Sequence, residues 1–182
     1  MIAKVRAAIR YAFVSCLLLV VFGALLPGAA SAAPVSRLNG TQFAAATGTA
    51  IHAHGAGVIR VGAFYYWFGE NRNPDSTFFA VSCYRSTDLK NWEFRNHVLT
   101  ASSAAELNPA NIERPKVVFN ASTGRYVMWM HWENGVNYSE ARAAVASSAT
   151  VDGNYTYHGS FRPLANTGVI AAGFVGLILA MA

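Results

Sequence analysis

The chain has 182 residues, a formal net charge of +5 and a hydrophobic share of 53%. This length is enough for one domain with a real core. Residues 1–32 hold three of the fourteen basic residues and none of the nine acidic ones, so 11 basic and 9 acidic residues remain outside them, a net charge of +2. No Lys/Arg cluster remains there that would indicate a nucleic-acid-binding protein.

Residues 1–32 have the features of a secretory signal peptide. A basic start is followed by an apolar stretch at 11–26, a Pro27-Gly28 break and the small residues Ala30-Ser31-Ala32. This order predicts secretion to the extracellular space, with cleavage before Ala33. The alternative is a single membrane anchor, but the cleavage pattern favours the signal peptide, so no stable membrane span is expected.

Cysteine usage and glycosylation motifs agree with secretion. Cys83 is the single cysteine outside residues 1–32, which rules out an internal disulfide, and its strand-like surroundings predict a buried thiol. Asn-X-Ser/Thr motifs in expected turns or loops are the predicted glycan acceptors: Asn39, Asn120 and Asn154. A fourth motif, at Asn137, adjoins the candidate site residue Tyr138 and is not among the predicted acceptors.

After a lead-in at 33–50, the chain is predicted to be all-β, because β-rich runs alternate with turn residues. The expected strands are 57–61, 64–70, 78–85, 92–98, 116–120, 125–132, 142–148 and 155–161. Tyr65 aligns with Tyr126 and Ser86 with Ser148, a period of about 60 residues that suits a large four-stranded propeller blade. A sandwich of eight strands is the alternative.

The final segment, 166–182, is apolar and has no charged residue. It is too short for a comfortable membrane span, which needs about 20 apolar residues. A lipid-anchor signal would need a polar spacer that is missing here. We therefore expect an aberrant tail, such as an incomplete or mis-spliced gene model would produce.

Four motifs in order carry a family resemblance: 52–57 (HAHGAG), 65–71 (YYWFGEN), 82–92 (SCYRSTDLKNW) and 112–117 (IERPKV). Together they resemble family 43 glycoside hydrolases, in particular the exo-β-1,3-galactanase branch (galactan 1,3-β-galactosidases). The resemblance implies a five-bladed β-propeller, of which this chain would hold about the first two blades. The domain, 51–165, would divide into blades at 51–111 and 112–165.

The resemblance also implies a function: hydrolysis of the O-glycosyl bonds of β-1,3-galactan by an inverting mechanism. The expected partner is a polysaccharide, β-1,3-galactan or the arabinogalactan of cell-wall glycans, with no cofactor and no metal. By this resemblance two glutamates bind hydroxyls of the terminal galactose and a tyrosine lines the same subsite, with rings nearby that could stack on the sugar. These substrate-binding candidates are Glu70, Glu113, Tyr138, His54, Trp67 and Trp132.

The catalytic residues are left unassigned, because the resemblance implies a general acid from later blades, beyond about Pro163. Without that acid a contribution of about a hundredfold to ten-thousandfold is lost. Two alternatives therefore stay open, a carbohydrate-binding pseudoenzyme and a non-functional fragment. Residue by residue, the glutamates could be ion-pair partners of Arg72 and Arg114, Trp67 a core aromatic and His131 a structural histidine.

Overall fold

The computed structural model describes residues 41–163, and within them the chain is almost entirely β. The predicted signal peptide, residues 33–40 of the lead-in with Asn39, and the apolar tail 166–182 lie outside the described residues. The strands are β1 (His54–Val61), β2 (Phe64–Arg72), β3 (Phe78–Ser86), β4 (Glu93–Thr100), β5 (Asn111–Asn120), β6 (Arg125–Glu133), β7 (Arg142–Ser148) and β8 (Thr156–Phe161), with a 3₁₀ turn, η1 (Ala105–Leu107), between β4 and β5. No described helix is long and apolar enough to cross a membrane.

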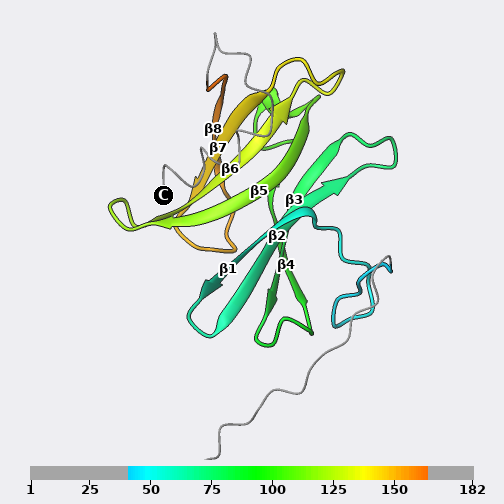
Figure 1. Cartoon of the computed structure of the whole chain (residues 1–182), viewed down its shortest axis with the longest axis vertical. Helices are drawn as coiled ribbons and strands as arrows, with labels where there is room; N and C mark the ends of the chain where they lie inside the picture. Colours follow the sequence, from blue (N-terminus) through cyan, green and yellow to red (C-terminus); the bar gives the residue numbers. More distant parts are fainter. Residues whose placement is uncertain (1–40, 164–182) are drawn as a thin grey trace, which may run out of the picture. The chain divides into compact units, whose positions relative to one another are not determined.

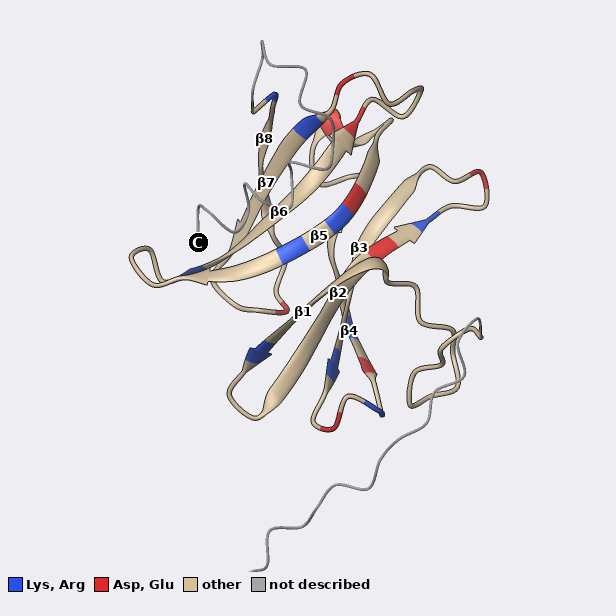
Figure 2. Cartoon of the chain, viewed as in Figure 1, with Lys and Arg blue, Asp and Glu red and all other residues tan. Residues whose placement is uncertain are grey.

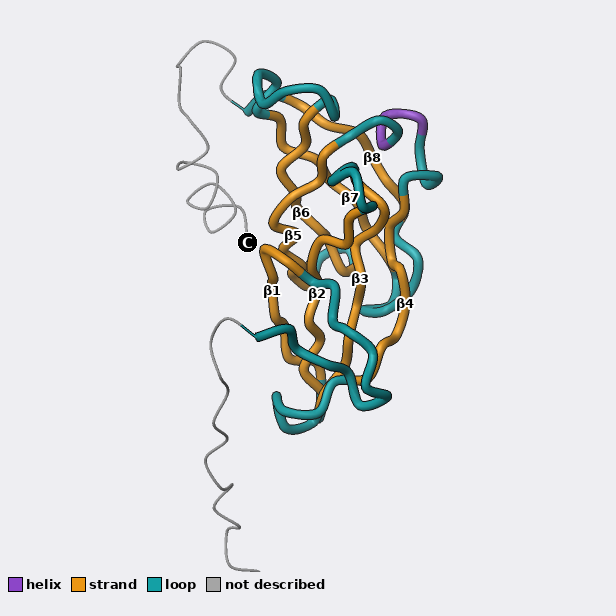
Figure 3. Tube along the Cα trace, turned by 90° about the vertical axis from the view of Figure 1, so that its right-hand side faces the viewer, coloured by secondary structure: helices purple, strands orange, loops and turns teal. Residues whose placement is uncertain are grey.

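The strands form two four-stranded sheets, ordered β1-β2-β3-β4 and β5-β6-β7-β8 (Figure 1). All neighbouring strands are antiparallel, and each sheet is built from consecutive strands, so no strand crosses from one sheet to the other. A Greek-key sandwich would exchange strands between its sheets. Figure 3 shows the same strands with η1, the single helical turn of the described residues. The predicted all-β class and the eight predicted strands are confirmed.

The internal repeat is visible in the strand register. Tyr65 lies opposite Ser86 in the first sheet, and Tyr126 lies opposite Ser148 in the second. The sequence period aligned Tyr65 with Tyr126 and Ser86 with Ser148, so equivalent residues pair in the same way in both sheets. The two sheets are therefore two copies of one four-stranded unit, as expected for propeller blades.

Two strands begin earlier than the sequence predicts. β1 starts at His54 and β5 at Asn111, and each contains a register shift, between His54 and Gly57 in β1 and between Glu113 and Lys116 in β5. The shift in β5 accommodates Pro115, which has no N–H to donate to a ladder and is tolerated at a bulge. The sequence prediction missed the first half of β5 because it treated this proline as a strand entrance.

A shared core joins one face of each sheet. Its fully buried side chains come from both sheets and include Phe68, Leu99, Ile112, Met128 and Met130. Burying each such side chain stabilises the fold by about 1.5–3 kcal/mol. Cys83 lies in this core as a free thiol, as predicted, and burial raises its pKa, so it is unsuited to nucleophilic chemistry.

Close approach of β1 and β5 brings the first strands of the two sheets side by side. A Cβ at Gly57 would lie 2.8 Å from the carbonyl oxygen of Pro115, so only glycine fits there. Lys116 Nζ donates to the carbonyl oxygen of Gly55, at 3.1 Å, and to that of Ala56. Adjacent first strands are the arrangement of blades around a common axis.

Candidate functional site

A network of charged side chains lies where the end of β2 meets β5. Figure 2 shows acidic and basic residues next to one another on both strands. Alternation along β2 puts Tyr66, Phe68 and Glu70 on one face, and this face packs against the second sheet. The buried face of β2 therefore ends in a carboxylate that points toward β5.

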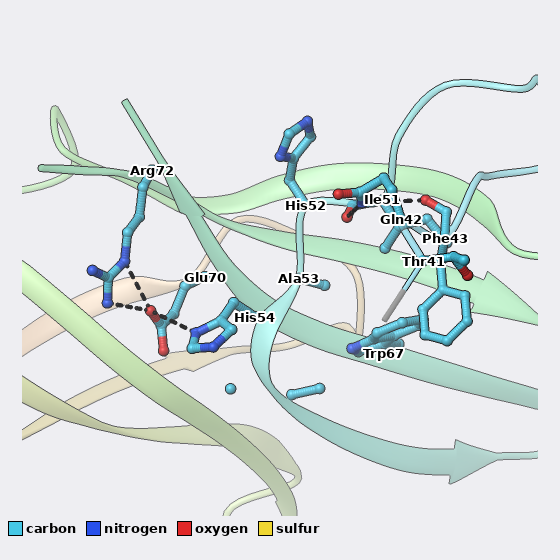
Figure 4. Close-up of a pocket in the computed structure, with 12 residues that line it drawn as sticks. Thr41, Gln42, Phe43, Ile51, His52, Ala53, His54, Trp67, Glu70 and Arg72 are labelled. Carbon is cyan, nitrogen blue, oxygen red and sulfur yellow. Dashed lines mark hydrogen bonds and ion pairs between the residues drawn. The ribbon is translucent and has the colours of Figure 1, made fainter. Parts of the chain in front are cut away.

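Glu70 is the most buried member of this network, with 1% of its side chain exposed. Its Oε1 accepts the backbone N–H of Arg114 in β5 at 2.9 Å. Its Oε2 accepts Arg72 Nε and Nη2, at 3.1 and 2.7 Å, and lies 3.5 Å from Nδ1 of the exposed His54 (Figure 4). Both oxygens are occupied from within the chain, and one of these bonds ties the two sheets together.

Arg72 links the two candidate glutamates. Its Nη2 lies 2.7 Å from Glu70 Oε2 and 2.8 Å from Glu113 Oε1. Two oxygens that share one nitrogen lie closer than the roughly 6.5–9.5 Å between the carboxyl groups of an inverting glycosidase. A guanidinium also fills the space between them, so this pair is unsuited to flank a scissile bond.

Glu113 is the more accessible of the two glutamates, with 15% of its side chain exposed. Its Oε1 also accepts the hydroxyl of Tyr138 at 2.7 Å, and its Oε2 lies 3.5 Å from His131 Nδ1. Burial opposes ionisation, but the hydrogen bonds from Tyr138 and Arg72 outweigh it and hold the pKa of Glu113 below its ordinary value. Glu113 is therefore an ionised hydrogen-bond acceptor at neutral pH.

An open groove of about 760 Å³ adjoins Glu70 and Arg72. Its other walls come from the segment before β1, from the start of β1 and from β2, and they include Gln42, His52 and Trp67 (Figure 4). The ring of Trp67 packs edge-on against Phe43 and Trp92, with centroids 6.2 and 5.0 Å away. Trp67 is thus both part of the second hydrophobic cluster and a wall of the groove.

Solved structures similar to this chain include exo-β-1,3-galactanases. The enzyme from Clostridium thermocellum is 60% identical over 74% of this chain, with a TM-score of 0.69. That from Phanerochaete chrysosporium, in a variant bound to β-1,3-galactotriose, is 44% identical over 68% of it, with a TM-score of 0.64. A GH43 β-1,3-galactosidase bound to galactodeoxynojirimycin is 42% identical over 68% of it, with a TM-score of 0.62.

The chain belongs to glycoside hydrolase family 43. It spans 29% of the length of each of the first two relatives and 37% of the third. The predicted family and the predicted partial propeller are therefore confirmed. No protein-family model and no curated protein matches the sequence.

The fold brings together Glu70, Glu113, Tyr138 and His54 among the predicted site residues of this family 43 chain. Trp132 lies apart in the core, with only 9% of its surface exposed, and its Nε1 donates to the carbonyl oxygen of Glu106 at 3.0 Å. A ring buried in this way presents no free face to a sugar. The stacking role expected of Trp132 therefore has no support in its position.

The remaining predictions concern glycosylation and the expected absence of a metal site. Asn120 and Asn154 are exposed, at the β5–β6 turn and just before β8, and their glycosylation stays a prediction. Within residues 41–163, no group of three or more His, Cys, Asp or Glu side chains is arranged to hold a metal ion.

Sequence reasoning missed two members of the network. It treated Arg72 only as a possible structural partner of Glu70, whereas Arg72 bridges both glutamates. It did not single out Glu133, which is buried and lies 2.8 Å from Nε2 of His131. The available signal for Glu133 was a carboxylate directly after the predicted strand 125–132.

Proposed function

We propose that the described residues form the galactose-binding side of a glycoside hydrolase that acts on β-1,3-linked galactan. The observation that carries this proposal is the Glu70–Arg72–Glu113–Tyr138 network. It offers an ionised carboxylate and a phenol hydroxyl at one partly exposed place. Sugar hydroxyls donate to carboxylates, and hydrogen bonds to charged acceptors are stronger than neutral ones. The relatives solved with β-1,3-galactotriose and galactodeoxynojirimycin support the choice of ligand.

Glu113 and Glu70 are assigned here to binding and orientation, not to proton transfer. A general acid must hold its proton at working pH, which needs a raised pKa, whereas the pKa of Glu113 is lowered. Arg72 between the two carboxylates leaves no room for the attacking water of an inverting mechanism. Inverting hydrolysis would therefore draw its general acid from another residue.

A carbohydrate-binding protein without turnover is the second candidate function. The same observation favours it, because Glu113 and Glu70 act in this network as hydrogen-bond acceptors and neither is placed for proton transfer. The two candidates differ in one readout. The hydrolase releases free galactose from β-1,3-galactan, while the binding protein retains the sugar unchanged.

The test measures binding of β-1,3-galactobiose to the full chain by calorimetry, together with release of galactose from β-1,3-galactan. Glu113→Gln is expected to weaken binding more than tenfold, because a charged acceptor contributes about 1.5–3 kcal/mol. Glu93→Gln is the control, since Glu93 on β4 is likewise a carboxylate that accepts from arginine, here from Arg85 and Arg95.

The outcomes separate the alternatives. Binding with galactose release supports the hydrolase, and binding without release supports the non-catalytic protein. If the parent chain does not bind the disaccharide, the result supports the alternative of a non-functional fragment. In a protein that carries all five blades, Glu113→Gln should lower galactose release strongly while the fold survives. Activity within a few-fold of the parent would show that Glu113 is structural.

A further inference from the structure

We propose that Glu133 is a positioning residue for the sugar site, holding Tyr138 through the loop 134–141 and Glu113 through His131. The identity of the sugar rests on the proposed function above. Glu133 itself touches neither Tyr138 nor Glu113 in any hydrogen bond or ion pair of the described residues. It acts on Tyr138 through the loop 134–141 and on Glu113 through His131.

The surroundings of Glu133 explain why a carboxylate is buried there. Its side chain is 1% exposed. Its Oε2 accepts the backbone N–H of Glu140 at 2.9 Å, and its Oε1 accepts that of Ala141 at 2.8 Å. Nε2 of His131 lies 2.8 Å from the same Oε1. A buried carboxylate is costly unless hydrogen bonds offset its desolvation, and here three donors do so.

The first route runs through the loop. The backbone amides of Glu140 and Ala141, which donate to Glu133, are at the far end of the segment 134–141. The carboxylate therefore holds this end of the loop against the end of β6. At its near end, Asn134 Oδ1 accepts the N–H groups of Val136 and Asn137, at 2.8 and 3.0 Å. The segment is therefore held at both ends, with Tyr138 between them.

Tyr138 shows the effect of this anchoring. It is 57% exposed, and an exposed tyrosine ordinarily samples several rotamers. Its hydroxyl nevertheless donates to Glu113 Oε1 at 2.7 Å. The ring contacts that of His131, with centroids 6.2 Å apart, and the position of the backbone supplies the rest of the alignment. That backbone is the segment that Glu133 closes.

The second route runs through His131. Its ring spans two carboxylates, with Nε2 2.8 Å from Glu133 Oε1 and Nδ1 3.5 Å from Glu113 Oε2. His131 and Glu113 are direct cross-strand partners of β6 and β5, so both side chains leave the same face of the sheet. Glu133 therefore orients the imidazole that faces the outer oxygen of Glu113.

The experiment compares Glu133→Gln with Glu140→Gln in the full chain. Glu140 lies in the same loop, but its side chain only approaches Arg142 and Arg162, at 3.9 and 3.7 Å. The readout is the titration of Tyr138, followed by NMR with ¹³C-labelled tyrosine and assigned with Tyr138→Phe. In the parent, the hydrogen bond to Glu113 raises the pKa of Tyr138 above its ordinary value.

Glu133→Gln is expected to return the pKa of Tyr138 toward the ordinary value of about 10, because the loop no longer presents the hydroxyl to Glu113. Hydrogen exchange of the Glu140 and Ala141 amides should accelerate in the same variant. Glu140→Gln should leave both readouts unchanged. Faster exchange with an unaltered Tyr138 titration would overturn the proposal, since Glu133 would then be only a loop anchor.

A second variant covers the case in which Glu133→Gln does not fold. Asn134→Ala removes the near anchor of the same loop and leaves the buried carboxylate intact. It should shift the Tyr138 titration in the same direction. An unchanged titration in Asn134→Ala would contradict the claim that the loop positions Tyr138.

Sugar binding then separates this proposal from the proposed function. Glu133→Gln should weaken β-1,3-galactobiose binding about tenfold, the effect of one hydrogen bond. Combined with Tyr138→Phe, it should weaken binding less than the sum of the two single effects, because both act on one contact. If the parent binds no disaccharide, the proposed function fails, while the titration and exchange results still decide the role of Glu133.

Discussion

The two sheets carry the same pair of side chains at equivalent positions but in opposite order. In the first sheet His54 of β1 lies opposite Glu70 of β2, and in the second Glu113 of β5 lies opposite His131 of β6. The residue after His54 in β1 and the residue after Glu113 in β5 both have a left-handed backbone, with φ of 62° at Gly55 and 51° at Arg114. A Glu–His cross-strand pair next to a left-handed residue therefore occurs once in each sheet.

The difference lies in how burial is divided between the two members of the pair. In the first sheet the glutamate is 1% exposed and the histidine 84%, and the glutamate binds a backbone N–H of the other sheet. In the second sheet the glutamate and the histidine are exposed to 15% and 14%. Exchanging the two residues thus separates a carboxylate that joins the sheets from one that remains accessible to a ligand. Variants at these positions can break or sharpen this contrast.

The largest effect is expected at Glu70. Glu70→Ala removes the buried partner of Arg72 and leaves the N–H of Arg114 without its acceptor. Breaking a buried pair from one side costs about 3–5 kcal/mol, and we expect a loss of about 3 kcal/mol because Arg72 keeps Glu113. The measurement is the free energy of unfolding in urea.

Glu93→Ala, in the exposed cluster with Arg85 and Arg95, is the control for Glu70→Ala and should change stability little. Equal losses in the two variants would remove the distinction between a structural and an accessible glutamate network.

An intermediate effect is expected at Gly55. Its φ of 62° disfavours any side chain, and a Cβ there would lie 2.5 Å from Glu70 Oε1 and 3.2 Å from Arg114 Cα. Gly55→Ala should therefore lower the free energy of unfolding by about 2–3 kcal/mol, from backbone strain and overpacking together.

Gly62→Ala is the control for Gly55→Ala, because Gly62 has a similar φ of 60° with no atom within 4 Å of a Cβ. Its loss should reflect backbone strain alone. If both variants lose the same amount, the close approach of Glu70 to β1 contributes nothing measurable.

The smallest effect, and one of opposite sign, is expected at Arg114. Arg114→Gly places in β5 the residue that β1 has at the equivalent position and relieves a left-handed conformation that costs roughly 1–2 kcal/mol. The greater freedom of glycine in the unfolded chain offsets part of this gain. We expect a stabilisation of up to about 1 kcal/mol, measured by thermal unfolding.

Arg114→Ala separates strain from charge, because alanine removes the guanidinium and keeps the Cβ. Only the glycine variant should stabilise the protein. A similar gain in both variants would trace the effect to repulsion from Lys116, whose pKa is lowered by burial and by Arg114.

The sequence by itself determined the fold class, the strands and the repeat. Alternating apolar residues and turn signals are local features, and the equivalence of Tyr65 with Tyr126 needs only the period of the repeat to be recognised. The resemblance of the four motifs was enough to name the family. It also named Glu70, Glu113 and Tyr138, which the structure brings together around Arg72.

Only the tertiary structure decided what each of these residues does. Arg72 meets Glu113, and Glu70 meets the N–H of Arg114, across more than forty residues of sequence. Period-two alternation assigns a side chain to a face of a sheet, but not to the sheet that packs against that face. The buried role of Trp132 depends on the same packing, and no local pattern encodes it.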